Sequence, residues 1–427
     1  MSTLHLRPVR LAPDPLGLYI RASRVDQREL QSFITSSSLA FTGVVFEAKR
    51  ASQQEELLTL VLERGLDAVL DPETQAMATS GRYVKSMDCL PWSKKRPHTQ
   101  GDLATRFEQR QFAEDIAKFA IAHGFTQVIA PTHLVVGPDD PWLEIDIACT
   151  DALRSALDRL GGAHIQLQYS LALSYEAFRT PVKRFAVLEK LRHANIDGLW
   201  LNISGCGVDS SPTAITRYGN AATDFHSLGM PIVADHVGGQ MGLSLLAFGA
   251  VGGISHGVTL GERLDTASWH KIPEGKGFGA KTRVYLPTLD LMLSRVDAER
   301  FFESGGGRSR SAFGCRDTNC CHRGVEDMLR TPGRHFLYQR TQQVASLGRI
   351  PESIRPTEFL EENLRPASDA ALVATKLPLP DDLKQKVNKQ AKRLNDLRTT
   401  LGPYAKKRRD LSFARHPISR VARGGIR

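Results

Sequence analysis

The sequence predicts an α/β protein, a (β/α)8 TIM barrel with an inserted subdomain after its eighth strand. Between residues 17 and 258, eight short apolar segments alternate with helix-like segments. Such alternation is typical of a parallel sheet covered by helices, and about 250 residues are enough for one barrel. A doubly wound open sheet is the main alternative, but no Gly-x-Gly-x-x-Gly motif follows the first strand.

The expected strands are apolar segments that end in polar residues or glycine. They lie at residues 17–23, 41–49, 67–73, 126–133, 163–173, 197–207, 230–236 and 251–256. The helices expected between them lie at residues 52–65, 103–124, 142–160, 180–193, 211–227 and 241–249. A polar loop of roughly thirty residues follows the third strand, and loops of that length tend to be functional.

The pattern changes after residue 258 and defines the expected domains. Residues 1–258 are the barrel, and residues 259–335, rich in Gly, Arg and Ser, are the insertion. Residues 336–380 contain the last barrel helix and a helical extension. Residues 381–427 contain an amphipathic helix and a basic tail that is poor in large apolar residues. We expect that tail to be disordered.

The formal charge of +10 is concentrated near the C-terminus. From Lys384 to Arg427 there are 14 Lys and Arg against Asp396 and Asp410, a net of +12, which leaves about −2 for the rest. A segment of this kind suits a polyanion, most often nucleic acid, although it can also be a solubilising tail.

The composition predicts a cytoplasmic protein without a membrane partner. No apolar run approaches the roughly 20 residues that a membrane span needs. The segment MSTLHLRPVRLAPDPLG lacks the apolar core of a signal peptide.

Polar residues stand where the predicted strands end, which is where a barrel places its active site. The strands around residues 230–258 end in Asp235 and His236, and in Ser255 and His256. Asp71 and Asp235 are the best carboxylate pair for nucleophilic attack and proton transfer. The other candidates at this edge are Arg21, Glu47, His133, Gln166 or Gln168, Asn202 and Ser204.

A cysteine cluster in the predicted insertion indicates a metal site. The residues are Cys315, Cys320, Cys321, His322 and His335. In a cytosolic protein such a cluster favours zinc over disulfides. We expect Cys315, one of the two adjacent cysteines, His322 and His335 to bind, because neighbouring cysteines can both bind only with backbone strain. A redox-active or incidental cluster is the alternative.

The glycines at the last two strands allow a different function. Gly238, Gly239 and Gly257 follow the seventh and eighth strands, where many barrels bind phosphate. A flavin mononucleotide or a phosphorylated small molecule would suit free backbone N–H groups there.

The layout resembles the tRNA-guanine transglycosylase superfamily, which includes the queuosine and archaeosine enzymes and relatives that insert deazaguanines into DNA. Those proteins are barrels with a zinc subdomain after strand eight, and here the cysteine cluster occupies that place. His335 begins the helix HFLYQRTQQV, as the zinc histidine of the family does. Asp71 in VLDPETQAM is similar to the functional aspartate of the family's third strand.

The resemblance also implies substrate-binding residues. Gly205 in LNISGCG is similar to the glycine turn that touches the base, and Gln166 or Gln168 to the base-reading glutamine. The family's nucleophilic aspartate ends strand eight in a Phe-Asp-Cys-Val context, whereas this chain has Ile-Ser-His-Gly. The resemblance therefore leaves attack to another residue, such as Asp235.

The function implied is a glycosyltransferase that exchanges a guanine-type base in nucleic acid, with structural zinc. Its partners would be tRNA or DNA, held by the basic C-terminus, and a purine or deazapurine base. A flavin- or phosphate-binding barrel enzyme and a non-catalytic nucleic-acid-binding relative are the alternatives. The sequence leaves open whether the chain forms a homodimer.

Overall fold

The computed structural model describes residues 16–271, 283–407 and 413–417 and confirms the predicted (β/α)8 barrel. Strand β4 pairs with β6 and strand β1 pairs with β9, which closes a ring of eight parallel strands. A two-residue strand, β5 (Leu134–Val135), adds to β6 outside this ring. The barrel strands are β1 (Gly17–Ala22), β2 (Gly43–Glu47), β3 (Asp67–Asp71), β4 (Gln127–Ile129), β6 (Gln166–Leu173), β7 (Gly198–Ile203), β8 (Ile232–Asp235) and β9 (Gly253–Gly257).

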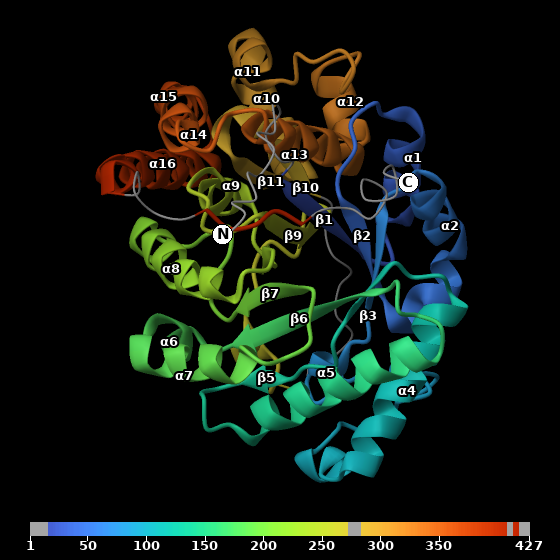
Figure 1. Ribbon diagram of the computed structural model, residues 1–427. Helices are drawn as coiled ribbons and strands as arrows, with labels where there is room; N and C mark the ends of the chain where they lie inside the picture. The colour runs from blue at the N-terminus through green and yellow to red at the C-terminus, as the bar shows by residue number, and fades with distance from the viewer. Residues whose placement is uncertain (1–15, 272–282, 408–412, 418–427) are drawn as a thin grey trace, which may run out of the picture.

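Helices surround the barrel, as Figure 1 shows. Several begin at side-chain caps that the sequence supplies: Thr105 and Glu108 form a capping box, and Asp140 and Ser211 each precede a proline. The surrounding helices are α1 (Gln27–Ser36), α2 (Glu55–Glu63), α4 (Arg106–Ala122), α5 (Pro141–Arg159), α6 (Tyr175–Arg179), α7 (Pro181–Leu191), α8 (Pro212–Asp224), α9 (Gly239–Ala247) and α13 (Pro332–Gly348).

The barrel interior is filled by side chains from its strands. A separate buried cluster consists of Tyr19, Val45, Val69, Ile129, Trp200 and Val233. The rings of Tyr19 and Trp200 lie 5.0 Å apart between centroids. Because side chains alternate along a strand, residues two positions later point inward again, one layer nearer the C-terminal mouth. This cluster, which we call the floor, therefore closes the barrel beneath the mouth.

The insertion lies between β9 and α13, as the sequence predicts. It contains an antiparallel hairpin of β10 (Arg283–Leu286) and β11 (Leu291–Ser294). Helices α10 (Arg295–Ser304), α11 (Gly306–Phe313) and α12 (Val325–Arg330) follow. Figure 1 shows these helices grouped beside α13.

The helical extension follows α13. It contains α14 (Arg355–Glu358), the π-helix η7 (Phe359–Leu364), α15 (Arg365–Ala374) and α16 (Asp381–Lys407). Helix α16 is longer than the predicted 381–401 because it continues through Pro403. Its apolar residues, among them Leu383 and Leu394, are buried, while lysines such as Lys389 are exposed. None of the helices in the described ranges is long and apolar enough to span a membrane.

Residues 413–417 correct the prediction of disorder for that part of the tail. Ala414 donates its N–H to Gly249 O at 2.9 Å, and Arg415 forms a parallel bridge with Pro231. A Cβ at Gly252 would collide with the carbonyl of Arg415. Small residues at the N-terminal ends of the strands therefore leave room for this segment. Because the segment contains few large apolar residues, its composition does not indicate that it packs against the barrel.

A Gly252→Val substitution should destabilise the protein by about 1–3 kcal/mol, because the new side chain must displace Arg415 or the barrel strand. Urea denaturation measures the effect. Gly402→Ala is the matched control, since no atom lies within 4 Å of a Cβ at that helical glycine. Equal stability of wild type and Gly252→Val would show that the segment does not dock there.

Candidate active site and metal centre

The candidate active site lies at the C-terminal ends of the barrel strands. Arg21, Asp71 and Asp235 each follow a floor residue by two positions, so their side chains point into the barrel one layer above it. They come from β1, β3 and β8. Residues far apart in the chain thus converge on one point.

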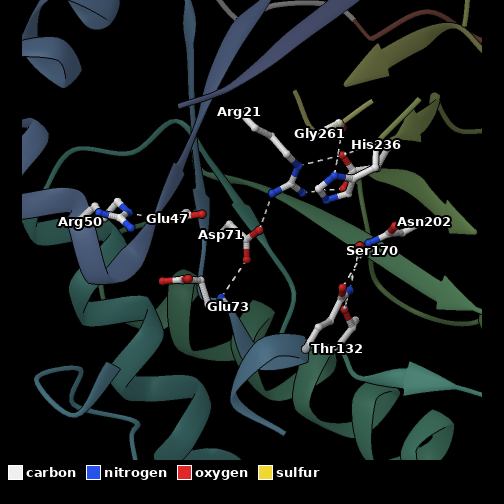
Figure 2. Close-up of polar contacts among 12 residues, drawn as sticks. Arg21, Glu47, Arg50, Asp71, Glu73, Thr132, Ser170, Asn202, His236 and Gly261 are labelled. Atoms are coloured by element: carbon white, nitrogen blue, oxygen red, sulfur yellow. Dashed lines mark hydrogen bonds and ion pairs between the residues drawn. The ribbon is translucent and has the colours of Figure 1, made fainter. Parts of the chain in front are cut away.

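Arg21 joins the two carboxylates. Its Nη1 donates to Asp71 Oδ2 at 2.7 Å, and its Nε and Nη2 donate to the two oxygens of Asp235 at 2.9 Å and 2.5 Å. Figure 2 shows the guanidinium reaching across the mouth toward Asp71. The bidentate pair with Asp235 is the geometry in which arginine–carboxylate contacts are strongest.

Asp235 is held ionised by this contact. Burial would raise the pKa of this carboxyl, but the positive charge of Arg21 and its hydrogen bonds lower the pKa to about 2. The Asp235 side chain is 0% exposed, whereas that of Asp71 is 21% exposed. Asp235 therefore holds the Arg21 guanidinium in place, and Asp71 is the carboxylate of the pair that a ligand can reach.

Glu73 is a second carboxylate beside Asp71. Its backbone is in the left-handed region, with a φ of 62°, and its N–H donates to Asp71 Oδ1 at 2.8 Å. Its carboxylate is ion-paired with Lys49, whose Nζ also lies 3.1 Å from Glu47. Burial outweighs the lysine and, with the negative charge of Glu47, raises the pKa of Glu73 to about 7. A carboxyl with this pKa can give and take a proton near neutral pH.

Gln75 connects the other side of the mouth. Its Nε2 donates to Thr132 Oγ1 and Ser170 Oγ, each at 3.1 Å, and its Oε1 accepts from Asn202 at 3.2 Å. The Oδ1 of Asn202 is buried and has no hydrogen-bond partner among the described residues. Gln75 therefore links α3 (Thr74–Met77) to β6 and β7 across the mouth.

A cavity of about 300 Å³ opens at the mouth. His236, with a φ of 56°, and Glu73 both border it, so two strained non-glycine residues face one cavity. Such strain is concentrated at functional sites. Burial lowers the pKa of His236, which keeps its ring neutral. The charged residues that line the cavity are Asp26, Glu47, Asp71 and Glu73 against Arg21 and Arg82, so its charge is mainly negative.

The structure brings together some of the predicted site residues and separates others. Asp71, Asp235, His236 and Asn202 surround the mouth. Gln166 and Gln168 lie at the other end of β6, where Gln168 fills the space beside Gly198. His256 points outward and packs against Phe336 of α13 at 5.6 Å between rings.

The remaining predicted residues have structural partners. His133 is buried, with its Nδ1 2.6 Å from Asp146 and its ring stacked on Trp142. Ser204 hydrogen-bonds to Thr266, and Gly205 donates its N–H to Leu264 O at 2.9 Å. These contacts hold the loops after β4 and β7 in place.

The glycine turn after β8 is filled by carboxylates of the chain itself. Gly239 N–H donates to Glu262 at 3.0 Å, and Gln240 N–H donates to Asp290 at 3.1 Å. A Cβ at Gly238 would collide with Glu262, which is itself paired with Arg340 at 3.1 Å. The start of α9 therefore receives two carboxylates at the place where a phosphate would bind.

A second set of residues in the insertion could hold a metal ion. Donor atoms of Cys315, Cys320, Cys321 and His335 all lie within 4.8 Å of one another. The Sγ atoms of Cys320 and Cys321 are 3.7 Å apart, and His335 Nδ1 lies 3.3 Å and 3.4 Å from them. A tetrahedral ion of zinc's dimensions would hold such atoms roughly 3.5–3.8 Å apart. His335 Nε2 donates to Tyr285 O at 3.0 Å, which fixes Nδ1 as the ligand atom.

The expected ligand set needs one correction. Both adjacent cysteines join the cluster, and His322 is exposed and lies outside it. The N–H groups of Cys320 and Cys321 both donate to Asp317 O in a turn, and neither cysteine has a positive φ. The predicted backbone strain is therefore absent, and both thiols face the same point.

Sequence reasoning missed Glu73 and Gln75 as site residues. Both follow Asp71–Pro72 in a short turn and helix α3 (Thr74–Met77), which folds them back over the mouth. The usable signal was a glutamate and a glutamine directly after an inward-facing aspartate at a strand end.

No protein-family model matches the chain, and no curated protein matches it. Orotidine 5'-monophosphate decarboxylase from Methanocaldococcus jannaschii is similar in structure at 8% identity, over 60% of this chain and 96% of that chain, with a TM-score of 0.36. The 3-dehydroquinate dehydratase from Enterococcus faecalis matches at 12% identity, over 57% and 90%, also with a TM-score of 0.36. The barrel assignment rests on strand pairing.

The stability of the protein should fall as the pH rises through the titration range of Glu73. Its pKa is raised from 4.5 to about 7 in the folded protein. The contribution of the protonated carboxyl to the free energy of unfolding is therefore fully present below pH 4.5 and is lost as the pH rises through 7. The loss should approach about 3 kcal/mol relative to Glu73→Gln, which has no such group. Urea denaturation across this range tests it, with Glu55→Gln on exposed α2 as control. Parallel curves for wild type and Glu73→Gln would contradict the raised pKa.

Proposed function

We propose that this barrel is an enzyme in which Asp71 and Glu73 form a carboxylate pair of divided roles. The supporting observation is their placement on one turn, with the pKa of Glu73 raised to about 7 and Asp71 paired with Arg21. Two carboxylates whose environments differ in this way are typical of acid–base and glycosidic chemistry.

The reaction we propose is exchange of a guanine-type base at a glycosidic bond, and the mouth has suitable chemistry for it. Asp71 bonds to the sugar carbon as that carbon's bond to the base nitrogen breaks, and Glu73 gives its proton to the departing base. An incoming base then returns a proton to Glu73, and its nitrogen displaces Asp71. The negative charge of Asp71 favours the positive charge that develops on the sugar.

The substrate class follows from the acceptors at the mouth. The unpaired Asn202 Oδ1 and the Gln75 amide can read the N–H edge of a flat heterocycle. The basic face of α16 would hold the phosphates if the base belongs to tRNA or DNA. Arg393 of α16 donates to Val208 O in the loop after β7, so this helix adjoins the mouth side of the barrel.

A small-molecule substrate is the second candidate. A cavity of about 300 Å³ holds one base-sized molecule, and pockets of this size usually serve small ligands. The carboxylates at the start of α9 make a neutral or cationic small molecule more suitable than a phosphorylated one.

Base exchange with a radiolabelled guanine-type base tests the proposal, with tRNA, duplex DNA and free guanosine as alternative acceptors. Asp71→Asn and Glu73→Gln should each lower the rate by about 10²-fold or more, and Glu73→Gln should also remove a pH-dependent limb near 7. Glu55→Gln is the matched control. Exchange only with guanosine would favour the small-molecule candidate, and full activity of Asp71→Asn would exclude the mechanism.

We propose that the insertion holds structural zinc through Cys315, Cys320, Cys321 and His335. Three sulfurs and one nitrogen gathered within 4.8 Å of one another suit a structural zinc site, which usually has four such ligands. The ion would stabilise the fold of the insertion, and the mouth residues need no metal in the proposed reaction.

Purified protein should therefore contain one zinc per chain by elemental analysis. Cys321→Ser and His335→Ala should lose the metal and unfold at lower temperature, because binding of structural zinc is coupled to folding. His322→Ala, next to the cluster but exposed, should retain it. Equal zinc in His335→Ala and His322→Ala would contradict the ligand set.

A further inference from the structure

A second cavity, of about 570 Å³, lies away from the barrel mouth. The insertion, the start of α9, α13 and the helical extension border this open cavity, and it shares no lining residue with the mouth cavity. We call it the insertion cavity. Its lining includes Gln240, Pro287, Cys315, Gln339, Gln342 and Ala370.

Several amide side chains line the insertion cavity among apolar residues. Helix α13 places Gln339, Gln342 and Gln343 on the side that faces the cavity, and Gln240 joins them from the start of α9. The three glutamines of α13 are half-buried, whereas Gln240 is buried, and buried polar atoms normally have partners. Both ends of the Gln343 amide are satisfied, by the Tyr285 hydroxyl and the Arg340 guanidinium. Gln240, Gln339 and Gln342 are therefore the amides that could serve a ligand.

The contacts of these glutamines show which atoms remain for a ligand. Gln339 donates its amide N–H to Cys315 Sγ at 3.6 Å, and Gln342 donates to Asp317 at 3.5 Å. Because sulfur and carboxylate act as acceptors there, the carbonyl oxygens of the two amides are left for other contacts. Gln240 is 3% exposed, and its Oε1 has no hydrogen-bond partner among the described residues.

The opposite wall supports the same conclusion. The π-helix η7 contributes Glu362 and Asn363, and π-helical turns frequently occur at functional sites. Of the charged residues, Asp317 and Glu362 are negative, while the guanidinium of Arg316 donates to Ser311 O. Acceptor oxygens and negative charge disfavour a phosphate or carboxylate ligand.

We propose that the insertion cavity binds a small molecule with a guanidine unit, whose N–H groups meet the carbonyl oxygen of Gln240 and those of its neighbours. Pro287 and Ala370 offer flat apolar contacts for such a planar group. A guanidine unit occurs as the donor edge of a guanine ring and also in arginine-like molecules. The site is independent of the reaction proposed at the mouth.

Isothermal titration of the full-length chain with guanosine, inosine and methylguanidine tests this site. Guanosine or methylguanidine should bind, and inosine, which lacks the 2-amino group, should bind roughly tenfold more weakly or worse. Gln240→Leu should weaken binding by a similar factor, and Ala370→Trp should abolish it by filling the cavity. Gln385→Leu on the exposed face of α16 is the matched control.

Three results would overturn the proposal. One is the absence of binding by guanosine and methylguanidine at millimolar concentration. Another is unchanged binding in Ala370→Trp, which carries the test if Gln240→Leu does not fold. The third is binding that is lost in Asp71→Asn but kept in Ala370→Trp, because the ligand would then occupy the mouth. Failure of base exchange with intact binding would affect only the proposed reaction.

Discussion

The contact of Arg21 with Asp71 and Asp235 is the constraint on which the rest of the mouth depends. It ties β1 to β3 and to β8, three strands that are separated in the chain and in the ring. Removing the arginine would leave two carboxylates without their counter-ion above an apolar floor, one of them with no exposure. Unpaired buried charge is among the costliest defects in a protein, so the three side chains must be retained together.

The fold could be predicted because its signals are local. Apolar strands, helix caps and the alternation of strands with helices can each be recognised from neighbouring residues. Eight such strand–helix units are enough to form a closed ring. The docked segment at residues 413–417 could not be predicted in this way. Its position depends on glycines such as Gly252, because a side chain there would collide with Arg415, which is distant in the sequence. Contacts of that kind leave no periodic pattern in either segment.

The active site was predictable only in part, for a related reason. Asp71 and Asp235 stand at strand ends and could be chosen from the alternation of side chains. Gln168 was predicted to lie at the mouth but does not. A long strand has several inward-facing positions, and the pairing of Gln168 with Gly198 places it toward the N-terminal end of β6. Glu73 could not be predicted, because the position of its carboxylate depends on a positive φ. A positive φ at a glutamate cannot be read from the sequence. In the metal cluster, a turn around Asp317 allowed both adjacent cysteines to face the same point.

The carboxylates at the start of α9 connect the insertion to the barrel mouth. His335 in the Cys/His cluster contacts Tyr285 O, the Tyr285 hydroxyl donates to Asp290 at 3.1 Å, and Asp290 accepts the N–H of Gln240. Gln240 follows the turn that leaves β8, the strand that carries Asp235. An uninterrupted path of hydrogen bonds and backbone thus leads from the cysteine cluster to the counter-ion of Arg21. Loss of order in the insertion would be transmitted along this path to the mouth. The distant cysteine cluster would therefore stabilise the arrangement of charges there.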